Sequence, residues 1–125
     1  MFFWYFMVIV SLLIPGTMIG FGRYFMESAP KNINATFGYR TKRSMMNMDT
    51  WQFAHAYVGK LWFRWGVGLL VLSVSAMLLV LGKDMDTVGI WGLGVVLVQM
   101  LPLVGSIFPT ERALKRTFDE YGRRK

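Results

Sequence analysis

The residues best suited to chemistry in this sequence are a single histidine, His55, and a glutamine, Gln99, inside an apolar run. An imidazole can transfer protons near neutral pH, but Asp49 lies six residues earlier, off the same face of a helix. No Ser-His-Asp set, paired carboxylates or HExxH pattern occurs, and cysteine is absent. We therefore predict no catalytic residues, no metal and no cofactor, with His55 forming hydrogen bonds at an interface.

A second chemically active feature is the basic segment FGYRTKRSMMNMDTW at residues 37–51. Its guanidinium and ammonium groups can bind a phosphate or a carboxylate. Positive charge alone is typical of cytoplasmic segments of membrane proteins. However, Asn, Gly, Thr and Ser surround these cations, and these residue types favour turns stabilised by local hydrogen bonds. We therefore predict an ordered loop that could hold a phosphate headgroup, a carboxylate terminus or an acidic segment of a partner.

Three apolar runs are long enough to cross a membrane, at about residues 2–22, 61–81 and 88–108. A helix of about 20 residues spans about 30 Å, the thickness of the hydrocarbon layer. The first run has no preceding Lys or Arg and no following cleavage site of small residues, so we interpret it as a retained span. The short turn GKDMDT predicts a tight hairpin of the second and third spans. The expected fold is an all-α integral membrane protein with one domain, residues 1–125.

Positive charge predicts how the chain is oriented in the membrane. Residues 23–64 carry seven Lys or Arg, the tail at 109–125 carries six, and the turn between the second and third spans carries only Lys83. Basic segments face the cytoplasm, so we expect a cytoplasmic loop at 23–50, a cytoplasmic tail and an outside N-terminus. The net charge of +7 then indicates contact with anionic lipid headgroups rather than with nucleic acid.

Both cytoplasmic segments contain signals for helices beyond the spans. Asp49 resembles an N-cap, which predicts one helix from Thr50 to the outer face of the membrane. Helical spacing places Trp51, His55, Val58 and Trp62 on one face and stacks Lys60 and Arg64 on another, within reach of lipid phosphates. In the tail, Thr110 can cap an amphipathic helix that Gly122 ends, with an apolar stripe of Leu114, Phe118 and Tyr121.

Several residues inside the spans have two interpretations. Pro15 predicts a kink, and the small residues Gly16 and Gly20 mark a helix crossing within or between subunits. Gln99 and Pro102 could line a transport pathway, or they could form an interhelical hydrogen bond and a packing kink. We favour packing, because no acidic residue lies inside any span and cation-coupled transport usually needs one.

The polar loop resembles the SdpI family of small membrane proteins. The similar pattern is Asn34-x-x-x-Gly38-Tyr39-Arg40-Thr41 followed by Ser44, Asn47, Trp51, His55 and Gly59, and the tail from Pro109-Thr110-Glu111 to Gly122 is also similar. The resemblance covers about residues 15–125. Together with two cations on the next span, it gives our candidate binding residues: Asn34, Gly38, Tyr39, Arg40, Thr41, Ser44, Asn47, Trp51, His55, Lys60 and Arg64.

The resemblance implies a function. The family's namesake protects a toxin-producing bacterium from its own antimicrobial peptide and sequesters a cytoplasmic repressor at the membrane. A member would be a non-enzymatic protein of the bacterial inner membrane that binds a toxin peptide or a cytoplasmic regulator. Gly38 would permit a tight turn, and Arg40 would anchor the loop or bind an anionic group. Tyr39 and Trp51 would pack the loop against the interface, and a homodimer would complete the bundle. The alternatives are a small transporter or channel subunit and an anionic-lipid-binding protein.

Overall fold

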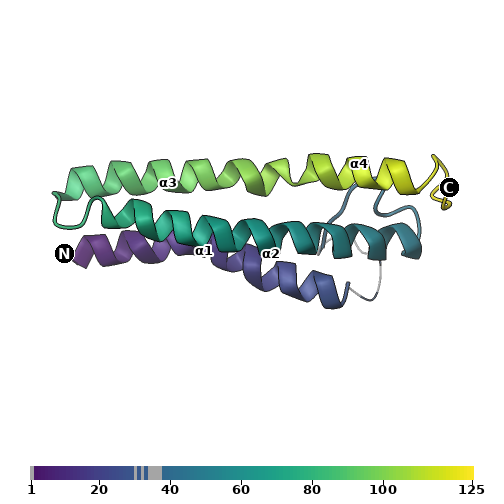
Figure 1. The fold of residues 1–125 in the computed structure, drawn as a ribbon, viewed down its shortest axis with the longest axis horizontal. Helices are drawn as coiled ribbons and strands as arrows, with labels where there is room; N and C mark the ends of the chain where they lie inside the picture. The colour runs from purple at the N-terminus through teal and green to yellow at the C-terminus, as the bar shows by residue number, and fades with distance from the viewer. Residues whose placement is uncertain (1, 30, 32, 34–37) are drawn as a thin grey trace.

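The protein is a long bundle of helices that lie side by side (Figure 1). The computed structural model describes residues 2–29, 31, 33 and 38–125. These residues form four helices: α1 (Phe2–Glu27), α2 (Met48–Leu78), α3 (Met85–Gly105) and α4 (Ile107–Thr117). The helices long and apolar enough to cross a membrane in this part of the chain are α1, α2 and the combined length of α3 and α4. The predicted all-α class with three spans is therefore confirmed.

The two ends of the bundle differ in character. One end holds the N-terminal end of α1 and the turn at residues 79–84, and we call it the hairpin end (Figure 1). The other end holds residues 38–47 and the C-terminal tail, and we call it the loop end. Helix α2 has 31 residues, which is about 46 Å and exceeds a hydrocarbon layer of about 30 Å. Which end faces the cytoplasm stays a prediction from the charges.

A backbone-to-backbone contact joins α1 to α2. A Cβ atom on Gly22 would lie 2.6 Å from the Phe63 backbone nitrogen and 2.8 Å from the Gly59 carbonyl oxygen. A Cβ atom on Gly59 would lie 2.7 Å from both the Gly22 oxygen and the Met26 nitrogen. Only residues without a side chain fit at such distances, so this pair sets where the two helices cross. Small residues make the same kind of contact between other membrane helices.

Gly16 and Gly20, which the sequence marked as a possible helix crossing, do not take part in the contact between α1 and α2. A Cβ atom on Gly16 or Gly20 would meet no atom within 4 Å, so these residues do not form a crossing within the described chain. The expectation of an internal crossing there is therefore wrong, and one between subunits stays untested. Pro15 lies inside α1, and α1 changes direction along its length in Figure 1, as a helix does where proline removes an amide donor.

At the hairpin end, two tryptophans bond to the last turn of α2. The Trp4 indole donates to the Met77 carbonyl at 2.8 Å, and the Trp91 indole donates to the Ala76 carbonyl at 2.7 Å. Carbonyl groups in the last turn of a helix can accept further hydrogen bonds, because they lack a regular intrahelical partner. The Trp4 indole therefore joins α1 to α2, and the Trp91 indole joins α3 to α2. The predicted tight hairpin is only partly right, since α3 contacts α1 more extensively than it contacts α2.

Within the bundle, Gln99 joins all three long helices. Its Nε2 donates to the Ser11 carbonyl of α1 at 2.7 Å and to the Ser73 hydroxyl of α2. Gln99 is buried. In an apolar environment each unpaired polar group costs free energy, so such bonds hold membrane helices together. This geometry confirms the packing interpretation of Gln99.

The predicted tail helix begins earlier and ends earlier than expected. Ser106 has helical dihedral angles (φ −61°, ψ −20°), so the chain passes from α3 into α4 with no free N-terminus to cap. Thr110 instead donates its hydroxyl to the Ser106 carbonyl at 2.8 Å. Leu114 and Phe118 are buried, as the apolar stripe predicts, but Tyr121 is 70% exposed because α4 has ended at Thr117.

The glycine contact generates a stability prediction. We expect Gly59→Ala to lower the free energy of unfolding by about 1–3 kcal/mol, because the added methyl group would overlap backbone atoms of α1. Gly20→Ala is the matched control, since its methyl group would meet no atom within 4 Å. Thermal unfolding of both variants in nanodiscs provides the measurement. Equal melting temperatures for the two variants would contradict the assigned crossing.

Candidate functional site

Helix α2 begins with a reciprocal pair of hydrogen bonds at the loop end. The Asn47 Oδ1 accepts from the Thr50 backbone N–H at 2.9 Å, and the Thr50 hydroxyl accepts from the Asn47 backbone N–H at 3.1 Å. This is a capping box with Asn47 at the N-cap and Thr50 in the position where Glu is commoner. The prediction that Asp49 caps this helix is wrong, because Asn47 already occupies the extended cap position.

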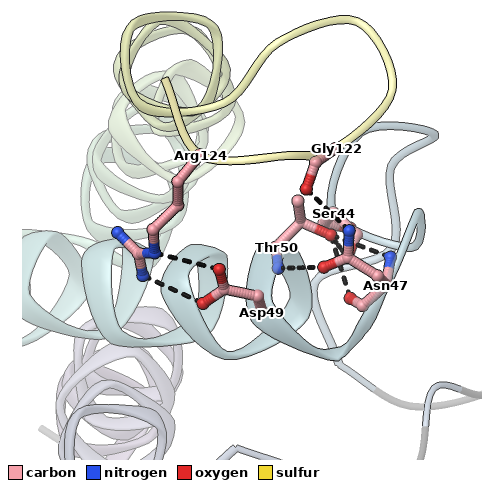
Figure 2. A network of polar contacts seen from close by, with 6 residues as sticks. All are labelled: Ser44, Asn47, Asp49, Thr50, Gly122 and Arg124. Carbon is pink, nitrogen blue, oxygen red and sulfur yellow. Dashed lines mark hydrogen bonds and ion pairs between the residues drawn. The ribbon is translucent and has the colours of Figure 1, made fainter.

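Asp49 instead forms an ion pair with the C-terminal tail (Figure 2). The Arg124 Nε and Nη2 donate to the two carboxylate oxygens of Asp49, each at 2.9 Å. The same guanidinium lies 4.9 Å from the centre of the Phe118 ring. A two-bond pair has defined geometry. Since the two side chains are 57% and 49% exposed, we expect it to orient the tail more than to stabilise the fold.

A second bond holds the tail on the start of α2. The Asn47 Nδ2 donates to the Gly122 carbonyl at 2.7 Å, so one side chain both caps α2 and fastens the tail (Figure 2). Gly122 has φ 79°, a conformation that favours glycine, and a Cβ atom there would lie 2.7 Å from the Asn47 Nδ2. Residues 118–125 therefore fold back on α2 as a clasp, and we use that name for them below.

The polar residues of the loop bond to one another. The Ser44 Oγ accepts from the Thr41 backbone N–H at 2.9 Å and lies 3.0 Å from the Tyr39 carbonyl oxygen, to which it can donate. The Thr50 hydroxyl reaches the Ser44 carbonyl at 3.1 Å. Ser44 and Thr50 are buried. The loop is thus connected through Ser44 to the first turn of α2, and the described part of the loop is ordered as predicted.

His55 connects the loop to the interior of the bundle. Its Nε2 lies 2.8 Å from the Tyr39 backbone nitrogen, and its Nδ1 lies 2.7 Å from the Trp51 carbonyl oxygen. An amide N–H can only donate and a carbonyl can only accept, so the proton belongs on Nδ1 and the ring is neutral. The ring is buried between Trp51 and Phe25, with centroids at 4.2 and 4.8 Å. The prediction that His55 forms hydrogen bonds at an interface is confirmed.

Tyr39 is buried between the loop and α4. Its hydroxyl donates to the Ile107 carbonyl at 3.4 Å. Burial, together with the nearby Glu111 carboxylate, raises the pKa of the Tyr39 phenol well above its ordinary value. The phenol therefore stays protonated and remains a hydrogen-bond donor at physiological pH.

The candidate residues divide into two groups. Seven of them form or flank the framework just described, with Gly38 at a positive φ of 108°: Gly38, Tyr39, Thr41, Ser44, Asn47, Trp51 and His55. The other three described residues, Arg40, Lys60 and Arg64, are exposed cations. Asn34 lies outside the described residues. Thr50, Gly122 and Arg124 were not among the candidate site residues, and their contacts at the start of α2 were not predicted, although the spacing Asn47-x-x-Thr50 is compatible with a capping box.

Fold and site together define a class: a three-span α-helical membrane protein with an ordered polar loop packed on the extension of its second span. Comparisons with known proteins agree. The model of the SdpI/YfhL protein family matches residues 31–110, which include residues 38–47 of the loop, all of α2 and α3, and the start of α4. The chain belongs to the SdpI family.

A bacterial relative supports this assignment. The chain is 36% identical over 75 residues to a Bacillus subtilis (strain 168) protein described as uncharacterized protein YfhL. This match covers 60% of the chain and 64% of the length of the relative, so the chain corresponds to a little under two thirds of that protein. No solved structure matches the chain.

The buried histidine generates a prediction about loop order. We expect His55→Leu to cost about 1–3 kcal/mol of stability, because the Tyr39 N–H then stays buried without an acceptor. The loop should also open, so trypsin should cleave after Lys42 and Arg43 faster than in the unmodified chain. Gln52→Leu, an exposed position on the same helix, is the control. Equal cleavage rates for the two variants would show that His55 does not hold the loop.

The start of α2 generates a second prediction. We expect Asn47→Ala to cost about 1–2 kcal/mol, because it removes an N-cap bond and the bond to Gly122. Asp49→Ala removes only an exposed ion pair, which is worth about 0.2–1 kcal/mol. Thermal unfolding of both variants measures the difference. If Asp49→Ala proved the more destabilising change, the assignment of Asn47 as the cap would be wrong.

Proposed function

We propose that this chain is a non-enzymatic protein of the bacterial cell membrane that acts by binding a partner at its loop end. The observation that carries the proposal is the fixed backbone on both sides of Arg40. The Tyr39 N–H is held by His55, and the Tyr39 carbonyl and the Thr41 N–H are held by Ser44. Arg40 itself is exposed. The loop thereby presents a guanidinium from a rigid base.

The chemistry of Arg40 indicates what kind of group it binds. A guanidinium forms paired hydrogen bonds with a carboxylate or a phosphate, and holding its base in place lowers the entropy lost on binding. Membership of the SdpI family supports two candidate partners, a membrane-active antimicrobial peptide and a cytoplasmic regulator. Any peptide or protein can offer a carboxylate. We propose immunity to a membrane-active antimicrobial peptide as the principal function, and signalling through a cytoplasmic regulator as the second candidate.

Charge supports a cytoplasmic position for the loop end. The loop and the clasp are both rich in Lys and Arg, and such segments remain on the cytoplasmic side of bacterial membranes. On this orientation Lys60 and Arg64, exposed and one turn apart on α2, lie near the headgroups of the inner leaflet, where we propose that they contact anionic lipid. A reporter fused after Lys125 that proved active only outside the cell would contradict this orientation.

Survival under toxin challenge tests the proposal. A sensitive bacterial strain expresses the chain and is exposed to a panel of secreted membrane-active peptides. We expect protection against at least one peptide. We expect Arg40→Ala to lower the highest peptide concentration that the strain survives about tenfold, since a charge-assisted hydrogen bond is worth about 1.5–3 kcal/mol. Lys42→Ala, an exposed cation in the same loop, is the control at matched membrane levels.

Three results would separate the alternatives. Equal losses in the Arg40→Ala and Lys42→Ala variants would mean that general positive charge, rather than a defined site, provides the protection. No protection against any peptide would count against immunity. In that case a cytoplasmic protein that co-purifies with the unmodified chain but not with Arg40→Ala would support the signalling role.

A further inference from the structure

Helix α4 continues α3 beyond the apolar part of the bundle (Figure 1). The two helices run on as one stretch of 33 residues, Met85–Thr117, because Ser106 between them has helical dihedral angles. Such a stretch is about 50 Å long, about 20 Å more than the hydrocarbon layer. Its last exposed large apolar side chain is Phe108, which is 71% exposed. The part of α4 after Phe108 therefore lies outside the hydrocarbon.

Three cations share the exposed face of α4. Arg112, Lys115 and Arg116 are all exposed, and their spacing of three and four residues places them on one side of the helix. Ala113 and Leu114 are buried on the other side. Among the residues that the structure describes, no ion pair joins these three cations to a carboxylate.

Carboxylates near α4 contact other groups. Asp49 and Asp119 form ion pairs with the two arginines of the clasp. Glu111 has a buried Oε2 and lies close enough to Tyr39 to raise the pKa of that phenol. The charge on the exposed face of α4 is therefore available to an anionic group from outside the described chain.

Depth distinguishes lipid headgroups from a partner in water. The headgroups add about 5–8 Å on each side of the hydrocarbon. Arg112 lies four residues after Phe108, a rise of about 6 Å along the helix. Lys115 and Arg116 lie seven and eight residues after Phe108, a rise of about 10–12 Å. Arg112 is thus level with the headgroups, whereas Lys115 and Arg116 lie beyond them.

Two cations on α2 lie at the depth of the headgroups. The Trp62 indole donates to the Ser106 hydroxyl at 2.8 Å, so Trp62 is level with the residues just before Phe108. Lys60 and Arg64 are exposed and lie within about 3 Å of Trp62 along the helix axis. This pair carries the same charge as Lys115 and Arg116 at a different depth, and it provides a matched control.

We propose that the exposed face of α4 binds an acidic segment of a water-soluble protein, whose carboxylates pair with Arg112, Lys115 and Arg116. A guanidinium forms defined pairs with carboxylates, and complementary charges fix how two surfaces align. The surface does not include Arg40. It adds a second contact surface to the binding role proposed above for the loop end.

Peptide binding to the full chain in nanodiscs of zwitterionic lipid tests the proposal. The probe is a fluorescent helical peptide of Ala and Glu with its Glu residues on one face, and its twin has Lys in place of Glu. Fluorescence anisotropy at low ionic strength measures both affinities. The test variant is Lys115→Gln with Arg116→Gln, and the control variant is Lys60→Gln with Arg64→Gln.

We expect the α4 variant to bind the Glu peptide about fivefold more weakly than the unmodified chain, since each exposed ion pair contributes a factor of about two to three. The control variant should change this affinity by less than about twofold. Lys115→Glu with Arg116→Glu should weaken binding of the Glu peptide further and strengthen binding of the Lys twin. A gain of that kind requires a folded chain.

Three results would overturn the proposal. Equal weakening in the α4 and control variants would mean that general positive charge attracts the peptide. Loss of co-purifying anionic lipid in the α4 variant, but not in the control variant, would mean that headgroups occupy the face. Binding of a single-stranded RNA of equal charge as tightly as the Glu peptide would mean that the face accepts any polyanion. Protection in the Arg40→Ala strain is a separate measurement, so failure here leaves the proposed function standing.

Discussion

The contact between the backbones of Gly22 and Gly59 is the constraint on which the rest of the loop end depends. Because neither residue has a Cβ atom, α1 approaches α2 closely enough to place Phe25 against His55. His55 lies one turn before Gly59, and Trp51 lies one turn before His55, so the three residues share one face of α2. Any side chain at the crossing would push α1 away from this face.

His55 links the crossing of α1 and α2 to the loop, because its ring packs on Phe25 and bonds to Tyr39. Both nitrogens of a neutral imidazole are used, one as a donor to Trp51 and one as an acceptor from Tyr39. Ser44 then fixes the Tyr39 carbonyl, and Thr50 fixes Ser44. The backbone groups of Tyr39 and Thr41 that flank Arg40 are thus bonded to Ser44 or to α2, and Arg40 is exposed. A connector between two spans would not need this ordering, whereas a binding surface benefits from it, because little entropy is then lost on binding.

The sequence was informative where the physical signal is local. Three runs of about 20 apolar residues predict three spans without knowledge of how they pack, and the Asn, Thr and Ser content of residues 38–50 predicts an ordered loop. The position of His55 on one face with Trp51 also follows from helical spacing. These features need no information about distant parts of the chain.

Features that depend on distant partners could not be predicted in the same way. The chain has 13 glycines, and only the pairing of α1 with α2 shows that Gly22 and Gly59 form the crossing while Gly16 and Gly20 do not. Asp49 resembled a cap because its type and spacing fit one. Its actual partner, Arg124, is 75 residues away. The expected cap at Thr110 failed because α3 leads directly into α4, which depends on the conformation of Ser106.

The most direct test of this account is hydrogen exchange at the Tyr39 backbone amide, measured with the full chain in nanodiscs. The amide should exchange slowly in the unmodified chain, because it is buried and bonded to His55. Gly59→Ala should accelerate this exchange although position 59 does not touch the amide, while Gly20→Ala should leave it slow. If the Tyr39 amide exchanged as fast as an exposed loop amide in the unmodified chain, or stayed equally protected in Gly59→Ala, the helix crossing would not control the order of the loop.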